Sequence, residues 1–410
     1  MKVGFLGNVN NHPFAVAKHF KDKGADVRFF VEAPQTDILY RPESTGYVTY
    51  PYPDWITEYP ALRKSVVIHF PQLFARDVIR ELNSCDAVIV NDYGHRFLPY
   101  LDKKVIRICM FTGGDLEIMA DLDNVTEMRM TSPKLKHFPA WFKKAYAKYS
   151  VRQLESGIRQ ADLVGYYPKG LNPFGDKLLQ HIFQGKPFRQ FSHWCVMLDG
   201  LAYELPPAHE KLRIFNVARF IWKKPFPPGT TKLEDKANDI MIYGLAKFLR
   251  RHPGSLDIHF VEKGIHLAET KALIDELGIR ESITWHREMP LKNLFEHIRQ
   301  SDIVFDQMGS HLFGAGIFAM AMGRPLITNA RPDILAQVTD HAPSPVCHAV
   351  TPEQVDDWLE KLYNDRELRE RIGKDSSNFA FRYMDIRHES DFYYNFIIEK
   401  MKLLHLEPHT

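Results

Sequence analysis

Cysteine is scarce in this sequence, at four residues in 410. The four lie far apart and form no C-x-x-C pair, which argues against a structural zinc site or a redox motif; they are Cys85, Cys109, Cys195 and Cys347. We expect isolated thiols in a reducing cytosol.

Long apolar runs are also missing. No stretch approaches the ~20 apolar residues that cross a bilayer. The opening residues MKVGFLGNVNNH reach glycine and three asparagines before any apolar run could form the core of a signal peptide. We therefore expect a cytoplasmic protein, which could still touch the inner face of a membrane.

Neither sign of charge dominates, because 53 Lys and Arg residues stand against 51 Asp and Glu residues and leave a net charge of +2. No global field can hold a polyanion, so we expect no nucleic-acid partner and only local anion sites. The sequence lacks the G-x-x-x-x-G-K-S/T, H-E-x-x-H and G-x-S-x-G motifs, and its first strand-to-helix turn lacks G-x-G-x-x-G. These absences argue against ATPases, dinucleotide dehydrogenases, zinc proteases and esterases. The 19 histidines are scattered, and we predict no metal site.

The chain does contain an alternation of short β-branched or aromatic runs with longer amphipathic segments, which is typical of parallel sheets joined by helices. The strands expected in the first half are Lys2–Gly7, Asp26–Val31, Asp86–Asn91, Val105–Phe111 and Leu163–Tyr167. Those expected after the proline-bearing stretch Leu205–His209 are Leu212–Val217, Leu256–Val261, Ile283–Trp285, Ile303–Asp306 and Pro325–Thr328. The expected helices include Phe14–Lys23, Ile240–Arg251, Ala268–Leu277 and Leu291–Gln300.

The fold class that follows is α/β, with two Rossmann-like, doubly wound parallel-sheet domains facing a central cleft. We place the N-terminal domain at residues 1–205 and the C-terminal domain at residues 206–388. We predict a C-terminal helix at 389–410, whose aromatic part, Asp391–Leu404, packs back on the N-terminal domain.

The most informative stretch is Ser301–Asn329. A strand ends at Asp306, a loop carries glycines at 309, 314 and 316, and a short helix, Ile317–Met322, is stopped by Gly323. Glycines let backbone N–H groups approach a ligand, and a helix N-terminus adds partial positive charge, so a diphosphate fits here. The alternative is a tight strand-to-helix turn without a ligand.

This stretch resembles the nucleotide-sugar loop of retaining GT-B glycosyltransferases, especially family 4, whose pattern is D-Q, a glycine-rich turn and E-A-M-A-x-G-x-P-V-I. The matching residues are D-Q at 306–307, the glycines at 309 and 314, A-M-A at 319–321, and Gly323, Pro325 and L-I at 326–327. Ser310 and Phe318 stand where the family has glutamates that hold the donor sugar's hydroxyls and the ribose. These two departures leave the donor and the activity open.

The segment Leu212–Arg219 and the lysine-rich stretch after it resemble the family's strand, arginine and K-G-x-D helix opening. K-A-N-D at 236–239 is the better match, and Lys223 or Lys224 is the rival by spacing. An arginine can donate two hydrogen bonds to a leaving diphosphate, and a lysine adds a compact positive charge. Either residue taken alone could equally be an ordinary solvent-exposed side chain. The implied diphosphate-binding residues are Arg219, Lys236, Lys224, Gly309, Ser310, Gly314 and Gly316.

The resemblance also covers the nucleotide base. E-K-G at 262–264 resembles the turn beneath the base, and Trp285–Met289 falls where the family's next loop contacts the base by backbone. The implied nucleotide-binding residues are Glu262, Gly264, His286 and Met289.

In the first domain, G-G-D-L at 113–116 resembles the family's acceptor-side G-S-D-L/I loop. Asp115 and His95 are the catalytic residues that we predict, His95 standing with Asp92 and Tyr93 after another strand. The loop that would close over the donor phosphates is represented by Gly7, Asn8, Asn11 and His12. Asp and Asn also favour caps and turns, so each of these residues could be purely structural.

Lys134–Arg152 interleaves basic and aromatic residues, KLKHFPAWFKKAYAKYSVR. Such a composition suits a helix on an anionic membrane surface, with Pro139 marking the helix start. An ordinary helix that packs its rings on the domain and turns its lysines to water explains the pattern equally well.

Together these features predict a glycosyltransferase that moves a sugar from a UDP- or GDP-linked donor to a glycan or lipid-linked acceptor, in cell-surface polysaccharide or glycoconjugate synthesis. By resemblance the reaction would be retaining and would need neither a metal nor another cofactor. The same architecture also hosts nucleotide-sugar epimerases and phosphorylases, and a non-catalytic nucleotide-sugar-binding relative is a further alternative.

Overall fold

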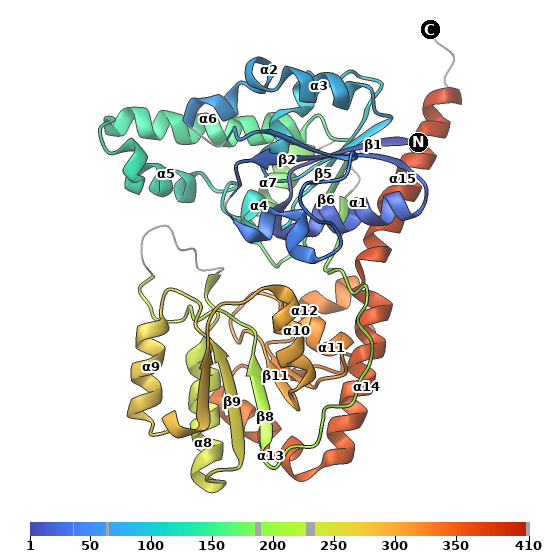
Figure 1. Cartoon of the computed structure of the whole chain (residues 1–410). Coiled ribbons are helices and arrows are strands. Elements are labelled where there is room, and N and C mark those ends of the chain that lie inside the picture. The colour runs from blue at the N-terminus through green and yellow to red at the C-terminus, as the bar shows by residue number, and fades with distance from the viewer. Residues whose placement is uncertain (36, 63–64, 185–189, 227–233, 407–410) are drawn as a thin grey trace. The chain divides into compact units, whose positions relative to one another are not determined.

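A computed structural model describes the chain except for residues 36, 63–64, 185–189, 227–233 and 407–410. The chain divides into two compact units (Figure 1). The N-terminal unit consists of Met1–Met197 and Ile386–Thr410, and the C-terminal unit is Leu198–Asp385. The last four residues of the predicted 389–410 helix lie outside the described residues.

In the described part of the N-terminal unit, seven parallel strands form one sheet in the order β3-β2-β1-β4-β5-β6-β7. They are β1 (Lys2–Leu6), β2 (Asp26–Ala33), β3 (Ile56–Pro60), β4 (Ala87–Val90), β5 (Ile106–Met110), β6 (Leu163–Tyr166) and β7 (Gln190–Ser192). The central strands β4 and β5 are buried along their whole length. Because helices cover both faces of a parallel sheet, its strands are continuous apolar runs and do not alternate apolar with polar residues.

The helices of this unit are α1 (His12–Asp22), α2 (Pro71–Phe74), α3 (Arg76–Asn83), α4 (Gly114–Glu117), α5 (Leu122–Thr131), α6 (Ala140–Ile158), α7 (Pro173–Phe183) and α15 (Ile386–Leu406). Helix α15 shares a buried core with α1 and one face of the sheet, to which it contributes Ile386, Tyr393, Phe396 and Ile397. A Cβ at Gly165 in β6 would collide with the Tyr393 hydroxyl, so the missing side chain lets α15 pack directly on the strand.

In the described part of the C-terminal unit, six parallel strands follow the order β10-β9-β8-β11-β12-β13. They are β8 (Leu212–Asn216), β9 (Leu256–Val261), β10 (Ile283–His286), β11 (Ile303–Phe305), β12 (Leu326–Thr328) and β13 (Cys347–His348). The helices are α8 (Asn238–Arg251), α9 (Leu267–Glu276), α10 (Leu291–Arg299), α11 (Gly316–Ala321), α12 (Pro332–Leu335), α13 (Pro352–Asn364) and α14 (Arg366–Tyr383). Side chains cap the starts of the last two, since Thr351 accepts from the Gln354 amide and Asp365 from the Leu368 amide.

The predicted α/β class with two parallel-sheet domains is confirmed. Three edge strands, β3, β7 and β13, were not predicted; two of them have only three and two residues. Among the described residues no helix combines the length and the apolar character that a membrane span needs.

Candidate functional site

Each sheet has one place where the strand order reverses, between β1 and β4 in the N-terminal unit and between β8 and β11 in the C-terminal unit. The loops after the two strands at such a point run in opposite directions, which leaves a crevice outside the carboxyl ends of these strands. Proteins with α/β sheets commonly bind their ligands in this crevice. The loops that follow these four strands are therefore the candidate functional site. They are described unit by unit.

In the C-terminal unit, the segment around Lys236 lies between the loops that follow β8 and β11. The Lys236 amide donates to the carbonyl of Ile221 at 2.6 Å, and the Lys236 carbonyl accepts from the amides of Met308 and Gly309 at 2.9 and 3.2 Å. A Cβ on Gly309 would collide with the Asp235 carbonyl, so the glycine permits this close approach. The structure thus brings two predicted diphosphate residues, Lys236 and Gly309, together.

The Lys236 side chain is half-buried, and its ammonium donates to Oε1 of Gln307. Gln307 is buried and its amide donates to the carbonyl of Leu312. Lys224, the rival lysine, has a side chain that is 69% exposed, and its ammonium lies 3.0 Å from a carboxylate oxygen of Asp235. Arg219 is exposed. A cation at Lys236 therefore faces the glycine-rich loop, whereas the Lys224 cation is paired at the surface.

The amides of Gly314 and Gly316 do not stand open to a ligand in this structure. Both donate to Oδ2 of Asp306, at 3.0 and 2.8 Å. The predicted diphosphate contacts of Gly314 and Gly316 would thus require the Asp306 carboxylate to give up these bonds. Glycine spacing predicted the turn correctly, but it could not show which acceptor the amides use.

The two positions that depart from the family pattern have ordinary local roles. Phe318 is half-buried on α11, and its ring meets that of Phe295 edge to face at 5.1 Å. Ser310 is exposed, and its carbonyl accepts a hydrogen bond from Arg331. Arg331 was missed by the sequence analysis, although its place soon after β12 at the carboxyl edge of the sheet was a usable signal.

The predicted nucleotide-binding residues lie beside each other at the ends of β9 and β10. The Glu262 amide donates to the His286 carbonyl at 2.8 Å, and the Glu262 carboxylate pairs with Lys271 at 2.6 Å. Gly264 has φ +122°, and a Cβ there would collide with the Phe220 backbone. Met289, three residues beyond β10, is half-buried.

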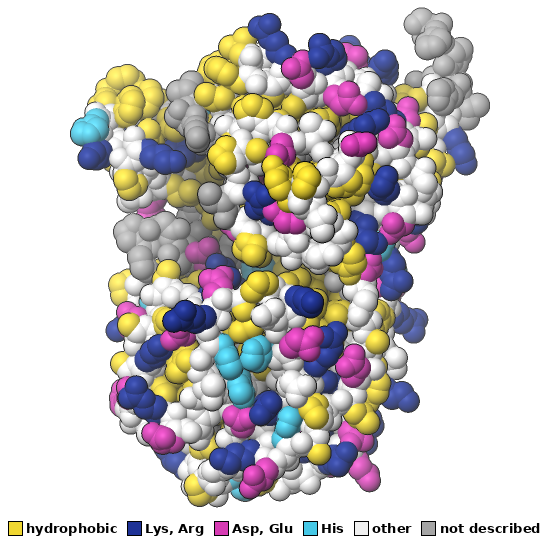
Figure 2. All heavy atoms as spheres, viewed as in Figure 1, with side chains coloured by type: hydrophobic (Ala, Val, Ile, Leu, Met, Phe, Trp, Pro, Cys, Tyr) yellow, Lys and Arg dark blue, Asp and Glu magenta, His cyan; other side chains and the backbone are white. Residues whose placement is uncertain are grey.

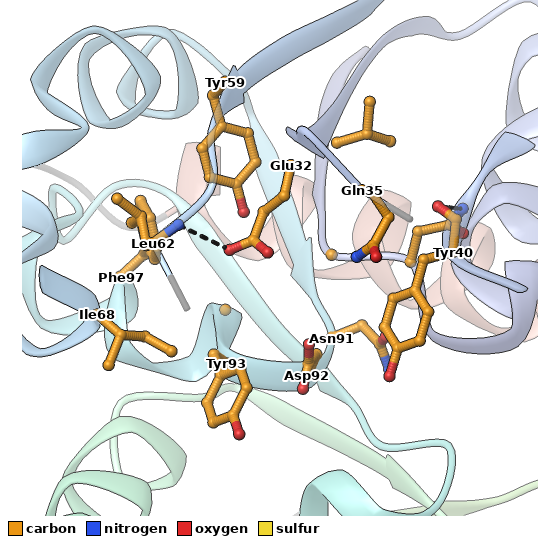
Figure 3. A pocket seen from close by; sticks show the side chains of 14 residues that line it. Glu32, Gln35, Tyr40, Tyr59, Leu62, Ile68, Asn91, Asp92, Tyr93 and Phe97 are labelled. Carbon is orange, nitrogen blue, oxygen red and sulfur yellow. Dashed lines mark hydrogen bonds between the residues drawn. The ribbon is translucent and has the colours of Figure 1, made fainter. Parts of the chain in front are cut away.

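In the N-terminal unit, a small pocket with a cavity volume of about 30 Å³ opens to solvent at the carboxyl ends of β1, β2, β3 and β4 (Figure 3). Figure 3 shows Glu32 and Gln35 reaching into it, with the Tyr59 hydroxyl directed at Glu32. One Glu32 oxygen accepts from the Leu62 amide at 3.2 Å. None of these four residues was predicted; each follows or ends a strand at the ligand-binding edge.

Asp115, predicted to be catalytic, lies inside the loop network beside this pocket. Its carboxylate is 9% exposed and accepts from the Asn91 side chain at 3.1 Å and from the amides of Asp92, Thr112 and Leu116 at 3.1–3.3 Å. Burial raises the pKa of Asp115 to about 7. These bonds tie the loop after β5 to the loop after β4.

His95, the other predicted catalytic residue, is 2% exposed. Its Nδ1 lies 2.9 Å from the Asp92 carbonyl oxygen, and its Nε2 has no hydrogen-bond partner among the described residues. Burial lowers the pKa of His95 well below its usual value. The ring is enclosed by protein in this structure, and the catalytic role of His95 stays a prediction.

The predicted closing loop after β1 is held by hydrogen bonds. Gly7 has φ +92°, and a Cβ there would meet the Asn91 carbonyl. The buried Asn8 side chain donates to Asn11 Oδ1 at 2.6 Å and to the Tyr40 carbonyl at 2.9 Å. His12 Nε2 lies 2.8 Å from Oε2 of the buried Glu389. Closure over a donor would have to break these bonds.

The stretch Lys134–Arg152 forms the start of α6 and the turn before it, with Pro139 at the N-cap as predicted. Trp141 is 71% exposed and Phe138 46%, and the Phe138 ring stacks on Phe142 at 4.7 Å. Lys143 is not part of the basic surface, because it is buried and its ammonium donates to the Met130 carbonyl at 3.3 Å.

Part of the C-terminal unit is similar to a known protein family. Residues 235–379 match the model of the family Glycosyl transferases group 1. D-inositol 3-phosphate glycosyltransferase of Nocardia farcinica is 31% identical over 145 residues, which cover 34% of this chain and 32% of that protein. The match therefore spans about a third of that relative.

Solved structures resemble the chain over nearly its whole length. Sucrose-phosphate synthase of Thermosynechococcus elongatus has a TM-score of 0.57 at 11% identity, covering 97% of this chain and 100% of that one. Anabaena HepE, in complex with UDP and glucose, has a TM-score of 0.60 at 12% identity with coverage of 97% and 100%. A glycosyltransferase of Rickettsia africae has a TM-score of 0.59 at 14% identity, with 97% of each chain covered. At such identities the likeness establishes a shared fold.

Proposed function

We propose that the protein transfers a sugar from a nucleotide-sugar donor to an acceptor hydroxyl. The proposal is supported by the match of residues 235–379 to the group 1 glycosyltransferase family model and by the fold that the chain shares with solved GT-B glycosyltransferases. The observation that carries the proposal is that the family domain includes Lys236 and the Asp306–Gly316 loop, at the strand-order reversal of its sheet. Fold alone would not fix the function.

The donor's diphosphate would lie against Lys236 and the loop after β11, with Arg219 within the segment that follows β8. As the bond from the sugar to the nucleotide breaks, negative charge grows on the leaving diphosphate. Cations fixed close to that position stabilise the transition state, a role that a metal ion plays in other enzymes. We propose transfer with retention and without a metal ion on the diphosphate.

The acceptor would occupy the N-terminal pocket at the ends of β1, β2, β3 and β4. Glu32, Gln35 and Tyr59 offer hydrogen-bond acceptors and donors there, which suit the hydroxyl groups of a sugar. A glycan, free or lipid-linked, is the acceptor class that we propose.

The exposed aromatic and basic side chains at the start of α6 support attachment to an anionic membrane, where a lipid-linked acceptor would be found. Figure 2 shows hydrophobic side chains beside Lys and Arg on the surface of the N-terminal unit. Trp141, Phe138 and the exposed Lys144 and Lys148 contribute to such a surface. Each lysine near a charged leaflet is worth about 1 kcal/mol. We propose reversible binding at the cytoplasmic face.

The function is tested with a thermal-shift screen against UDP-, GDP-, ADP- and CMP-sugars, followed by transfer assays in EDTA with the donor that stabilises the protein. NMR of the product would report the anomeric configuration. Transfer to a glycan with retention is expected. Conversion of the donor without any acceptor would favour an epimerase or phosphorylase, and binding without turnover on any acceptor would favour a non-catalytic relative.

A further inference from the structure

Three histidines from separate elements of the C-terminal unit meet at its surface. His259 lies on β9, His286 ends β10 and His297 lies on α10. One ring nitrogen of each lies within 4.8 Å of the others, and all three side chains are half-buried. Figure 2 shows histidine side chains gathered on the face of this unit, over its strands.

The rings are held in place by their surroundings. His259 Nδ1 lies 2.8 Å from His286 Nε2, and the two rings stack at a centroid distance of 5.1 Å. The His297 ring lies 4.3 Å from that of His286 and stacks on Phe215 of β8 at 5.3 Å. A site built on three packed elements loses little entropy when a ligand joins the rings.

The outer nitrogen of His259 faces a carboxylate. His259 Nε2 lies 3.0 Å from Asp257 Oδ2, and Arg213 Nε donates to the same oxygen at 2.9 Å. Metal-binding histidines usually donate their second N–H to a carboxylate, which fixes the tautomer and leaves the first nitrogen with its lone pair. In this structure the 3.0 Å contact is not a hydrogen bond, and His259 Nε2 has no hydrogen-bond partner among the described residues; a turn of the ring toward Asp257 would complete the arrangement and leave the Nδ1 lone pair for the ion.

The spacing is near that of a metal site without an ion. With metal–nitrogen bonds of about 2.1 Å, two ligands at 90° stand about 3.0 Å apart and two at the tetrahedral angle about 3.4 Å apart. The 2.8 Å between His259 Nδ1 and His286 Nε2 is a hydrogen bond between the rings, which an ion would replace by moving the two nitrogens slightly apart.

We propose that His259, His286 and His297 bind one divalent transition-metal ion such as Zn²⁺. Imidazole nitrogens suit Zn²⁺, Cu²⁺, Ni²⁺ and Co²⁺, and three protein ligands leave a further position for water. The ion would tie β9, β10 and α10 together. The cluster adjoins the predicted nucleotide-binding loop, because the His286 carbonyl accepts from the Glu262 amide, but metal binding by the three rings does not depend on the protein being a glycosyltransferase.

The test uses the full chain without a histidine tag, stripped with EDTA. Zn²⁺ is titrated by calorimetry, the bound metal is counted by mass spectrometry, and Co²⁺ reports its ligand field in the visible spectrum. The variants are His259→Ala and His297→Ala, with Asp257→Asn for the outer carboxylate. His341→Asn is the matched control, since His341 is exposed, lies in the same unit and belongs to no histidine cluster among the described residues.

We expect one ion per chain, a Kd weakened more than about a hundredfold by either alanine variant, and a 10- to 100-fold weakening by Asp257→Asn. The His341→Asn protein should bind like the parent, and circular dichroism should show all variants folded. No stoichiometric binding, or equal binding by His297→Ala, would overturn the proposal. If His12→Gln loses metal binding and His297→Ala keeps it, the metal binds instead at the His12, His193 and Glu389 cluster of the N-terminal unit. That result would also overturn the proposal.

Discussion

Replacing Lys236 by alanine should slow the proposed transfer about a hundredfold, whereas replacing Lys224 should hardly change it. The two lysines are rivals by sequence, but their surroundings differ. The Lys236 ammonium is half-buried and donates to a neutral amide oxygen of Gln307, while the Lys224 side chain is 69% exposed and already paired with Asp235.

The magnitude follows from these surroundings. Two unit charges about 4 Å apart at an effective dielectric constant of about 20 attract by about 4 kcal/mol. Giving up the charge-assisted hydrogen bond to Gln307 costs about 1.5 kcal/mol, which leaves about 2.5 kcal/mol, or close to a hundredfold in rate. An exposed ion pair such as that of Lys224 contributes only about 0–1 kcal/mol.

The assay is nucleotide release, measured as kcat/KM with the donor found in the screen, and calorimetric binding of the free nucleoside diphosphate. Melting temperatures of both variants control for unfolding. Unchanged turnover in Lys236→Ala combined with lost turnover in Lys224→Ala would show that the family's lysine corresponds to residue 224, and the diphosphate site described above would be misplaced.

Four other outcomes are expected. Gly264→Ala should destabilise the protein by more than about 1 kcal/mol and weaken nucleotide binding, because the new Cβ would collide with the Phe220 backbone at φ +122°. Gly254→Ala is the control, since Gly254 also has a positive φ but its Cβ would enter open space, and this variant should bind the nucleotide normally. Because no acid stands at the two positions where the family has glutamates, kcat/KM for a UDP-sugar and its 2′-deoxy analogue should be similar; strong rejection of the deoxy donor would reveal an unidentified polar group on the ribose. Lys144→Glu with Lys148→Glu should reduce flotation with anionic but not neutral liposomes, and equal flotation of parent protein with both would exclude charge-driven attachment. Burial lowers the pKa of His193 from 6.5 to about 4, so between these pH values the unfolded chain binds a proton that the folded protein does not. The free energy of unfolding should therefore fall as the pH drops through this range, by at most about 1.4 kcal/mol per pH unit. Urea unfolding at several pH values measures this slope, which should be smaller in His193→Phe.

The central strands could be predicted because burial on both faces forces long apolar runs. The bounds of β9, Leu256–Val261, agree with those expected from the sequence. The edge strand β13 could not be predicted, because two residues carry no periodicity and only their pairing with β12 defines them.

The candidate site was harder to predict, since proximity to a strand end does not say which way a side chain turns. Lys236 and Gly309 do meet at the reversal of the C-terminal sheet. His95 also follows a strand at the ligand-binding edge, yet its ring turns into the core. Glu32 ends an ordinary apolar strand, and only the fold shows that it faces a pocket.

The return of α15 to the first unit has a consequence for how the protein is made. A ribosome completes Met1–Met197 and all of Leu198–Asp385 before it adds the residues of α15. Until then, α1 covers only part of this face of the N-terminal sheet, and the part that later receives Tyr393, Phe396 and Ile397 lacks their side chains. The C-terminal unit, continuous in the chain, can fold during synthesis, while the N-terminal unit has to wait. The N-terminal unit is therefore translated first but completed last.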